Sequence, residues 1–136
     1  IETPNYTYLN EYRITKETYF LSIARLEPEN NLEIIFDGYI ASNIKVPYYI
    51  VGNYTTNYGK FLQEKYSNKG IIFLGAIFNK IHLDNLRYYS KLYIHGHSVG
   101  GTNPSLLEAM AAKTLIVAHK NLFLAKMDFI FHPLMN

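Results

Sequence analysis

The chain has 136 residues, of which 49% are hydrophobic and 18% charged, with a net charge of +2 and no cysteine. This balance indicates one globular domain and excludes a disulfide scaffold, a cysteine-ligated metal site and a thiol nucleophile. The basic residues form no run, so no nucleic-acid partner is expected, and no apolar stretch is long enough to span a bilayer.

Residues 1–18 are polar, contain Pro4 and show no sustained periodicity, which predicts a linker or lead-in segment. The chain starts at Ile1, with neither an initiator methionine nor a signal peptide. We therefore expect it to be cut from a longer protein, in which residues 19–136 form the domain. The absence of cysteine favours a cytoplasmic location.

Five short apolar runs follow, at residues 19–24, 48–51, 71–74, 92–94 and 114–118. Near-continuous apolar character predicts parallel strands that are buried on both faces. The segments between these runs carry apolar residues three and four positions apart, which is typical of amphipathic helices. This alternation predicts an α/β fold, a Rossmann-like three-layer α/β/α domain with a mainly parallel sheet of five or six strands. Residues 128–132 are the candidate sixth strand, at the sheet edge.

Glycine lies just past three of these predicted strands, at positions 52, 75 and 96. A chain leaving a parallel strand often needs an unusual backbone angle, which glycine supplies. Ligands of such sheets bind at the carboxyl ends of the strands, so we expect the functional site there.

Arg25 directly follows the first predicted strand, and the next helix is predicted to begin near Asn30 or Asn31. An arginine at that place can donate two parallel hydrogen bonds from its planar guanidinium to phosphate oxygens. The alternative is a surface ion pair with Glu27 or Glu29.

A glycine-rich turn, HGHSVGGTNPSLLEAMA at residues 95–111, joins the fourth predicted strand to the next predicted helix. Asn103 and Pro104 suit the first positions of a helix. Gly100 and Gly101 would let a ligand approach the free backbone amides at that helix start, which suits a diphosphate. The alternative is a tight turn with an ordinary helix cap.

Glu108 has two interpretations. It lies three residues after Ser105, which is the spacing of a capping box, where its carboxylate would satisfy only a backbone amide. A carboxylate in the first helical turn could instead accept two hydrogen bonds from a diol such as a ribose. The spacing alone leaves both open.

His95 and His97 would lie on one face of a strand, where two imidazoles can chelate a metal. A metal-dependent hydrolase is therefore a rival hypothesis. His82, His119 and His132 belong to no second ligand motif, so we expect no metal site. The expected roles are packing for His95 and a hydrogen bond to substrate or backbone for His97.

Four stretches of this sequence resemble one family, the carboxyl-terminal donor-binding domain of GT-B glycosyltransferases, specifically the retaining glycosyltransferase family 4. They are residues 24–31, 73–75, 100–111 and 116–119, within a resemblance that covers about residues 19–123. HGHSVGGTNPSLLEAMA and PENN are most similar to bacterial rhamnosyltransferase-like enzymes of capsule and cell-wall polysaccharide synthesis.

The resemblance implies that Arg25 contacts the donor diphosphate and that residues 100–105 contact phosphate and sugar through backbone amides. It also implies that Glu108 binds the nucleotide ribose and that the backbone around Ile77 holds the base. The donor would be a dTDP- or UDP-linked sugar, with no cofactor. The departing diphosphate would help to deprotonate the acceptor, so no protein nucleophile is needed. The donor-binding residues expected are Arg25, Asn30, Ile77, His97, Gly100, Gly101, Thr102, Asn103, Ser105 and Glu108.

Two positions depart from the family pattern. Gly100 stands where the first of two glutamates is usual, so Thr102, Asn103 or a backbone amide would contact the sugar hydroxyl. Asn30 stands near the place of a usual lysine, which leaves one phosphate charge uncompensated. Both departures fit a specialised donor such as a deoxysugar nucleotide, and they equally fit loss of activity; we favour the specialised donor.

Taken together, we expect the donor-binding half of a glycosyltransferase that is inactive alone, because the acceptor site belongs to a preceding domain. The acceptor would be a saccharide or a lipid-linked saccharide, and the longer protein would lie in the cytoplasm, at the inner face of the membrane. The alternative is a non-catalytic nucleotide- or phosphate-binding module. We expect the closing helices of the family to be absent, so the resemblance predicts no fold for residues 126–136.

Overall fold

A computed structural model describes residues 3–94 and 116–117 of the chain. At its centre is a five-stranded sheet of order β3-β2-β1-β4-β5, in which every neighbouring pair is parallel. The strands are β1 (Phe20–Ile23), β2 (Tyr48–Val51), β3 (Ile71–Gly75), β4 (Leu92–Ile94) and β5 (Ile116–Val117). This confirms the predicted α/β fold and its five apolar strands, whereas the candidate strand at residues 128–132 lies outside the described residues.

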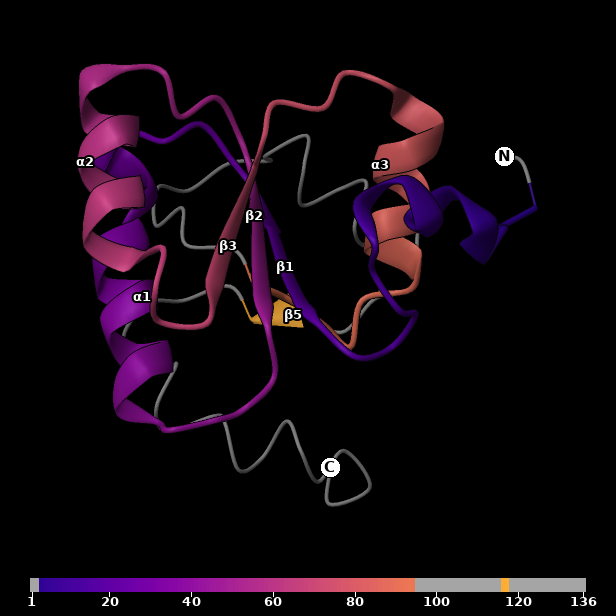
Figure 1. The fold of residues 1–136 in the computed structure, drawn as a ribbon, viewed down its shortest axis with the longest axis horizontal. Coiled ribbons are helices and arrows are strands. Elements are labelled where there is room, and N and C mark those ends of the chain that lie inside the picture. Colours follow the sequence, from indigo (N-terminus) through magenta and orange to yellow (C-terminus); the bar gives the residue numbers. More distant parts are fainter. Residues whose placement is uncertain (1–2, 95–115, 118–136) are drawn as a thin grey trace.

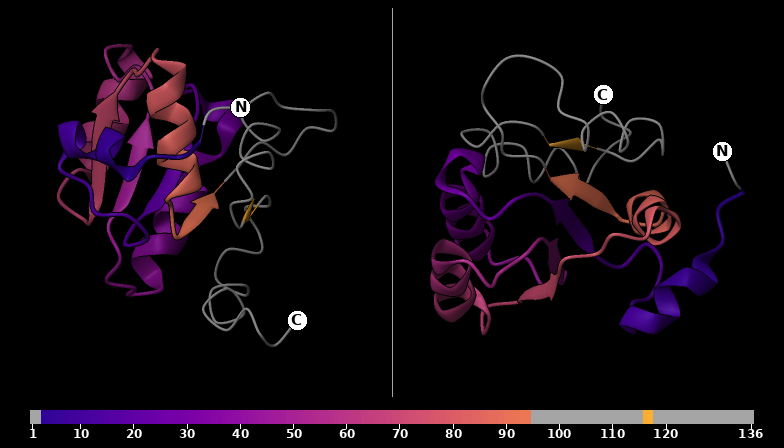
Figure 2. Two further views of the ribbon diagram at one scale, coloured as in Figure 1. Left: turned by 90° about the vertical axis from the view of Figure 1, so that its right-hand side faces the viewer. Right: turned by 90° about the horizontal axis from the view of Figure 1, so that it is seen from above.

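Helices cover both faces of the sheet, which gives the three predicted layers (Figures 1 and 2). On one face lie α1 (Leu32–Ala41) and α2 (Asn57–Tyr66), and on the other lies α3 (Lys80–Tyr88). The start of α2 is fixed by Thr56, whose Oγ1 accepts a hydrogen bond from the amide of Gly59. The start of α3 is fixed by Asn79, whose Oδ1 accepts from the amides of Ile81 and His82. Such caps satisfy amides that the helix itself leaves free.

Alternate strand residues supply two separate cores, because successive side chains of a strand point to opposite faces. Phe20 of β1 belongs to the core beneath α1 and α2, with Tyr48 and Ile50 of β2. Tyr19 and Leu21 belong to the core beneath α3. Burial on both faces explains why β1 and β2 read as continuous apolar runs.

The amino-terminal segment carries a 3-10 helix, η1 (Tyr6–Tyr12), which packs against α3 on the outer side (Figure 2). Leu9 and Ile14 are buried in the core beneath α3. The hydroxyl of Tyr12 lies 2.5 Å from Nδ1 of His82, and Oδ1 of Asn85 accepts from the amide of Asn5 at 2.7 Å. The stretch expected to lead into the domain is therefore packed onto it.

The helices α1, α2 and α3 span 10, 10 and 9 residues. Within the described part of the chain, no helix has the length and apolar character needed to cross a membrane.

Candidate functional site at the carboxyl edge of the sheet

Three connections leave the carboxyl ends of β1, β2 and β3 and run along one edge of the sheet (Figure 1). We call them the carboxyl-edge loops, and they comprise residues 24–31, 52–56 and 76–79. β1 is the strand at which the order of the sheet reverses, since β2 lies on one side of it and β4 on the other. The chain passes from β1 to α1 on one face and from β3 to α3 on the other (Figure 2). The reversal makes the carboxyl end of β1 the place where open parallel sheets bind ligands.

Arg25 stands at this point of reversal, two residues beyond the end of β1, with its side chain exposed. Leu26, the next residue, is buried in the core beneath α1 and α2 and anchors the loop. Among the described residues, Arg25 forms no ion pair, so the alternative of a surface pair with Glu27 or Glu29 is not realised. The guanidinium is therefore available to an anionic ligand.

The loop that carries Arg25 is held by hydrogen bonds to its own backbone. The carbonyl oxygen of Arg25 accepts from Nδ2 of Asn30 at 2.6 Å and from the amide of Glu27 at 3.0 Å. A short 3-10 helix, η2 (Pro28–Asn30), follows, and Asn31 links it to α1 with a φ of 57°. Asparagine tolerates this left-handed conformation better than most residues. Helix α1 thus begins where the sequence predicted, after Asn31.

The second carboxyl-edge loop packs directly against the first. A Cβ atom on Gly52 would lie 2.2 Å from the carbonyl oxygen of Ala24, so only glycine fits there. The amide of Ala24 also donates to the carbonyl of Val51 at 3.0 Å, and the amide of Gly52 donates to that of Gly75 at 3.0 Å. The first loop is therefore joined to the end of β2, and the second loop to the end of β3, backbone to backbone. Gly75 has a φ of +82°, which confirms that a chain leaving this strand needs an unusual backbone angle.

The third loop holds the position expected to bind the base. The side chain of Ile77 is half-buried and packs on the core beneath α3. Phe78, beside it, is 92% exposed, although an aromatic side chain is normally buried. The binding of a base to the backbone here remains a prediction.

Buried polar groups tie β1 to its neighbours close to this edge. Oγ of Ser22 donates to the carbonyl of Ile94 at 2.6 Å and lies 2.5 Å from the hydroxyl of Tyr48. Since a serine has a single hydroxyl proton, Tyr48 must be the donor to Ser22. Burial raises the pKa of Tyr48, so it keeps its proton at neutral pH. These bonds hold the carboxyl end of β4, from which the chain enters the glycine-rich motif, beside β1.

The remaining expected site residues lie outside the described residues. They are His97, Gly100, Gly101, Thr102, Asn103, Ser105 and Glu108, together with His95 of the possible metal pair. Within the part of the chain that the structure describes, no group of three or more His, Asp or Glu side chains could hold a metal ion. The structure therefore brings together Arg25 and Asn30 in one loop and places Ile77 in another loop of the same edge.

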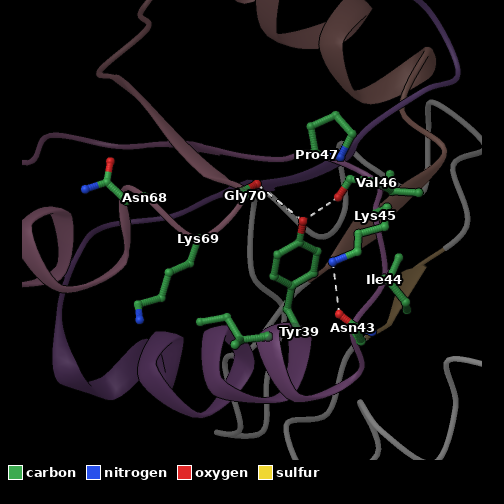
Figure 3. Close-up of a pocket in the computed structure, with 10 residues that line it drawn as sticks. Tyr39, Asn43, Ile44, Lys45, Val46, Pro47, Asn68, Lys69 and Gly70 are labelled. Atoms are coloured by element: carbon green, nitrogen blue, oxygen red, sulfur yellow. Dashed lines mark hydrogen bonds between the residues drawn. The ribbon is translucent and has the colours of Figure 1, made fainter.

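A separate hollow of about 500 Å³ lies at the opposite, amino edge of the sheet (Figure 3). Tyr39 reaches into it from α1 and donates a hydrogen bond to the carbonyl of Val46 at 2.5 Å. Lys45 and Lys69 lie on its rim. Because the tyrosine hydroxyl serves to tie α1 to the start of β2, we assign this hollow a structural role and the carboxyl edge the functional one.

Sequence reasoning missed two features of the site, the contact of Gly52 with Ala24 and the bond from Asn30 to Arg25. A glycine directly after a buried strand was the available sign of the first. The second depends on the left-handed turn at Asn31, which no periodic pattern indicates.

The sequence matches the family model described as glycosyl transferases group 1 over residues 7–127. A comparison with curated proteins found no match.

Several solved structures share the fold. The C-terminal domain of a glycosyl transferase group 1 family protein (LpcC) from Francisella tularensis aligns with a TM-score of 0.70 and 16% identity, over 97% of this chain and 84% of that one. The catalytic domain of cholesterol-alpha-glucosyltransferase from Helicobacter pylori aligns with a TM-score of 0.67 and 15% identity, over 87% and 89%. A trehalose-6-phosphate structure from E. coli, bound with UDP-2-fluoro glucose, aligns with a TM-score of 0.65 and 15% identity, over 84% and 36%. The chain thus spans about a third of the length of this last protein, and at these identities the likeness is one of fold.

Proposed function

Because this chain belongs to the glycosyl transferases group 1 family, we propose that it binds the diphosphate of a nucleotide-sugar donor at its carboxyl-edge loops. Arg25 would hold the phosphate oxygens, and the longer protein would transfer the sugar with retention of configuration. The observation that carries this proposal is the exposed Arg25, which forms no ion pair among the described residues, on a loop fixed at the reversal point of the sheet.

The chemistry assigned to this half is the stabilisation of a leaving group. When the bond between sugar and diphosphate breaks, negative charge grows on the phosphate oxygens, and a fixed guanidinium lowers the energy of that state. Arg25 is the only Lys or Arg in the three carboxyl-edge loops. Its loss would therefore remove the main positive charge that the described residues offer a diphosphate.

The nature of the donor is also a proposal. The E. coli structure that shares this fold is bound with UDP-2-fluoro glucose, which supports a nucleotide-sugar donor here. We propose a dTDP- or UDP-linked deoxysugar, with rhamnose as the leading candidate, and family 4 as the class. The ribose would bind Glu108, and the phosphates and sugar would lie against residues 100–105. Polysaccharide synthesis in bacteria is the setting that we propose.

A non-catalytic nucleotide-binding module is the second candidate. It is favoured by Asn30, which stands near the usual lysine and bonds to the Arg25 carbonyl, so that it adds no charge. The two candidates differ in the longer protein, which should consume its donor if it is a transferase and should only bind the donor if it is a module.

Titration of this chain with dTDP, UDP and GDP, and with the matching nucleosides, tests the binding proposal. We expect one diphosphate to raise the melting temperature and its nucleoside to raise it much less, since most of the binding energy would come from the phosphates. The effect should shrink with added salt, because the charged groups are exposed. No stabilisation by any diphosphate, or equal stabilisation by the nucleoside, would contradict the proposal.

A further inference from the structure

The peptide that follows Arg25 is fixed on both sides. Its carbonyl oxygen accepts one hydrogen bond from the Asn30 side chain at 2.6 Å and one from the Glu27 amide at 3.0 Å. The two donors satisfy both lone pairs of that oxygen. The orientation of this peptide therefore depends directly on the side chain of Asn30.

The peptide that precedes Arg25 is fixed as well. Gly52 lies against the carbonyl oxygen of Ala24, where a Cβ would approach to 2.2 Å, and Leu26 is buried beneath the loop. With the peptides before and after it held, Arg25 has little freedom in φ and ψ. The direction in which its side chain leaves the backbone is thus set before any ligand arrives.

Asn30 itself is held in the same turn. Its amide donates to the carbonyl of Glu27 at 3.0 Å, and one proton of its Nδ2 is used by Arg25. An asparagine bound in this way brings no charge to a phosphate, but it fixes the residue that does.

From this geometry we propose that Asn30 is a positioning residue, which acts on the donor diphosphate through the backbone of Arg25 and does not bind the phosphate itself. The inference rests on the proposed function. It replaces the expectation that Asn30 is itself a donor-binding residue, and it predicts that this loop gains affinity from pre-organisation instead of a second charge.

The experiment is a double-mutant cycle on this chain, with the diphosphate that binds in the screen above and its nucleoside as ligands. The variants are Asn30→Ala, Arg25→Ala and the double variant, with Asn30→Asp as an isosteric form that lacks the N–H donor. Asn68→Ala is the matched control, an exposed asparagine at the opposite edge of the sheet. Calorimetry gives the affinities, and thermal unfolding checks that each variant is folded.

We expect Asn30→Ala to weaken diphosphate binding about fivefold, as for the loss of one neutral hydrogen bond. Asn30→Asp should weaken it at least as much, because it loses the same donor and adds a negative charge near the anionic ligand. Nucleoside binding and the Asn68→Ala control should not change. In the Arg25→Ala background, Asn30→Ala should not weaken diphosphate binding any further, because a residue that acts through Arg25 has no effect without it.

Two results would overturn the inference while leaving the proposed function intact. One is an unchanged diphosphate affinity in Asn30→Ala when Arg25→Ala weakens binding. The other is an additive loss in the double variant, which would show that Asn30 contacts the phosphate directly. If Arg25→Ala itself has no effect, the proposed function fails and the inference fails with it.

Discussion

Gly52 packs so closely on Ala24 that a Cβ atom at position 52 would stand 2.2 Å from the Ala24 carbonyl oxygen. This contact joins the loop after β2 to the loop that carries Arg25. Because the atom in the way is backbone, it cannot move aside as the end of a flexible side chain can. The spacing of the two loops is thus set by the absence of a side chain.

Gly52→Ala should therefore destabilise the fold by about 1–3 kcal/mol, the usual cost of forcing an extra methyl group into a packed site. The same change should displace Ala24 and weaken the binding of a diphosphate. Urea unfolding measures the first effect and calorimetry the second. A variant as stable as the parent would show that the two loops are free to separate.

Ser22→Ala should cost about 1–3 kcal/mol, because it leaves the buried Tyr48 hydroxyl and the Ile94 carbonyl without their partner. The exposed Ser67, which ends α2, offers a control, and Ser67→Ala should change stability little. Both are measured by denaturant unfolding. Equal stability of the two variants would contradict the assigned role of Ser22 in tying β4 to β1.

High pH should destabilise the folded protein, because tyrosines whose pKa is raised by folding lose their protons there. Burial, followed by the hydrogen bond to Glu33, raises the pKa of Tyr58 from 10.0 to about 12. The folded protein favours the neutral form of the Tyr58 side chain. The contribution of Tyr58 to folding stability is therefore complete below pH 10 and is lost as the pH rises toward 12.

Tyr58→Phe should accordingly make stability fall less steeply over this alkaline range, while Tyr54→Phe serves as the control. Chemical unfolding at a series of pH values gives the slope. A slope that is the same in the variant and the parent would mean that Tyr58 titrates normally in the folded chain.

The sheet could be predicted from the sequence because β1, β2 and β4 are buried on both faces, and runs such as Tyr48–Val51 contain little else than apolar residues. The packing of η1 could not be predicted, since a 3-10 helix has no marked periodicity. This segment buries only single residues, such as Leu9 within η1 and Ile14 after it. Arg25 was predicted at the site from its place after a strand. The positioning role that we propose for Asn30 was not predicted, because it depends on a hydrogen bond between its side chain and the backbone carbonyl of Arg25.

The exposure of Phe78 was also unpredictable. Ile77 and Phe78 are adjacent and apolar, yet the first packs on the core beneath α3 and the second is 92% exposed. The direction of each side chain follows from the course of the loop after Gly75, whose φ is positive. No pattern of hydrophobic residues encodes such a course.

The central claim is that Arg25 binds the diphosphate of the donor, and one comparison of affinities tests it most directly. Arg25→Ala removes a positive charge at the carboxyl edge, and Lys69→Ala removes one at the opposite edge, on the rim of the hollow shown in Figure 3. We predict that Arg25→Ala weakens diphosphate binding about tenfold to a hundredfold, as expected for a charge-assisted hydrogen bond, while Lys69→Ala leaves it unchanged. An equal effect of the two variants, or none from Arg25→Ala, would contradict the account.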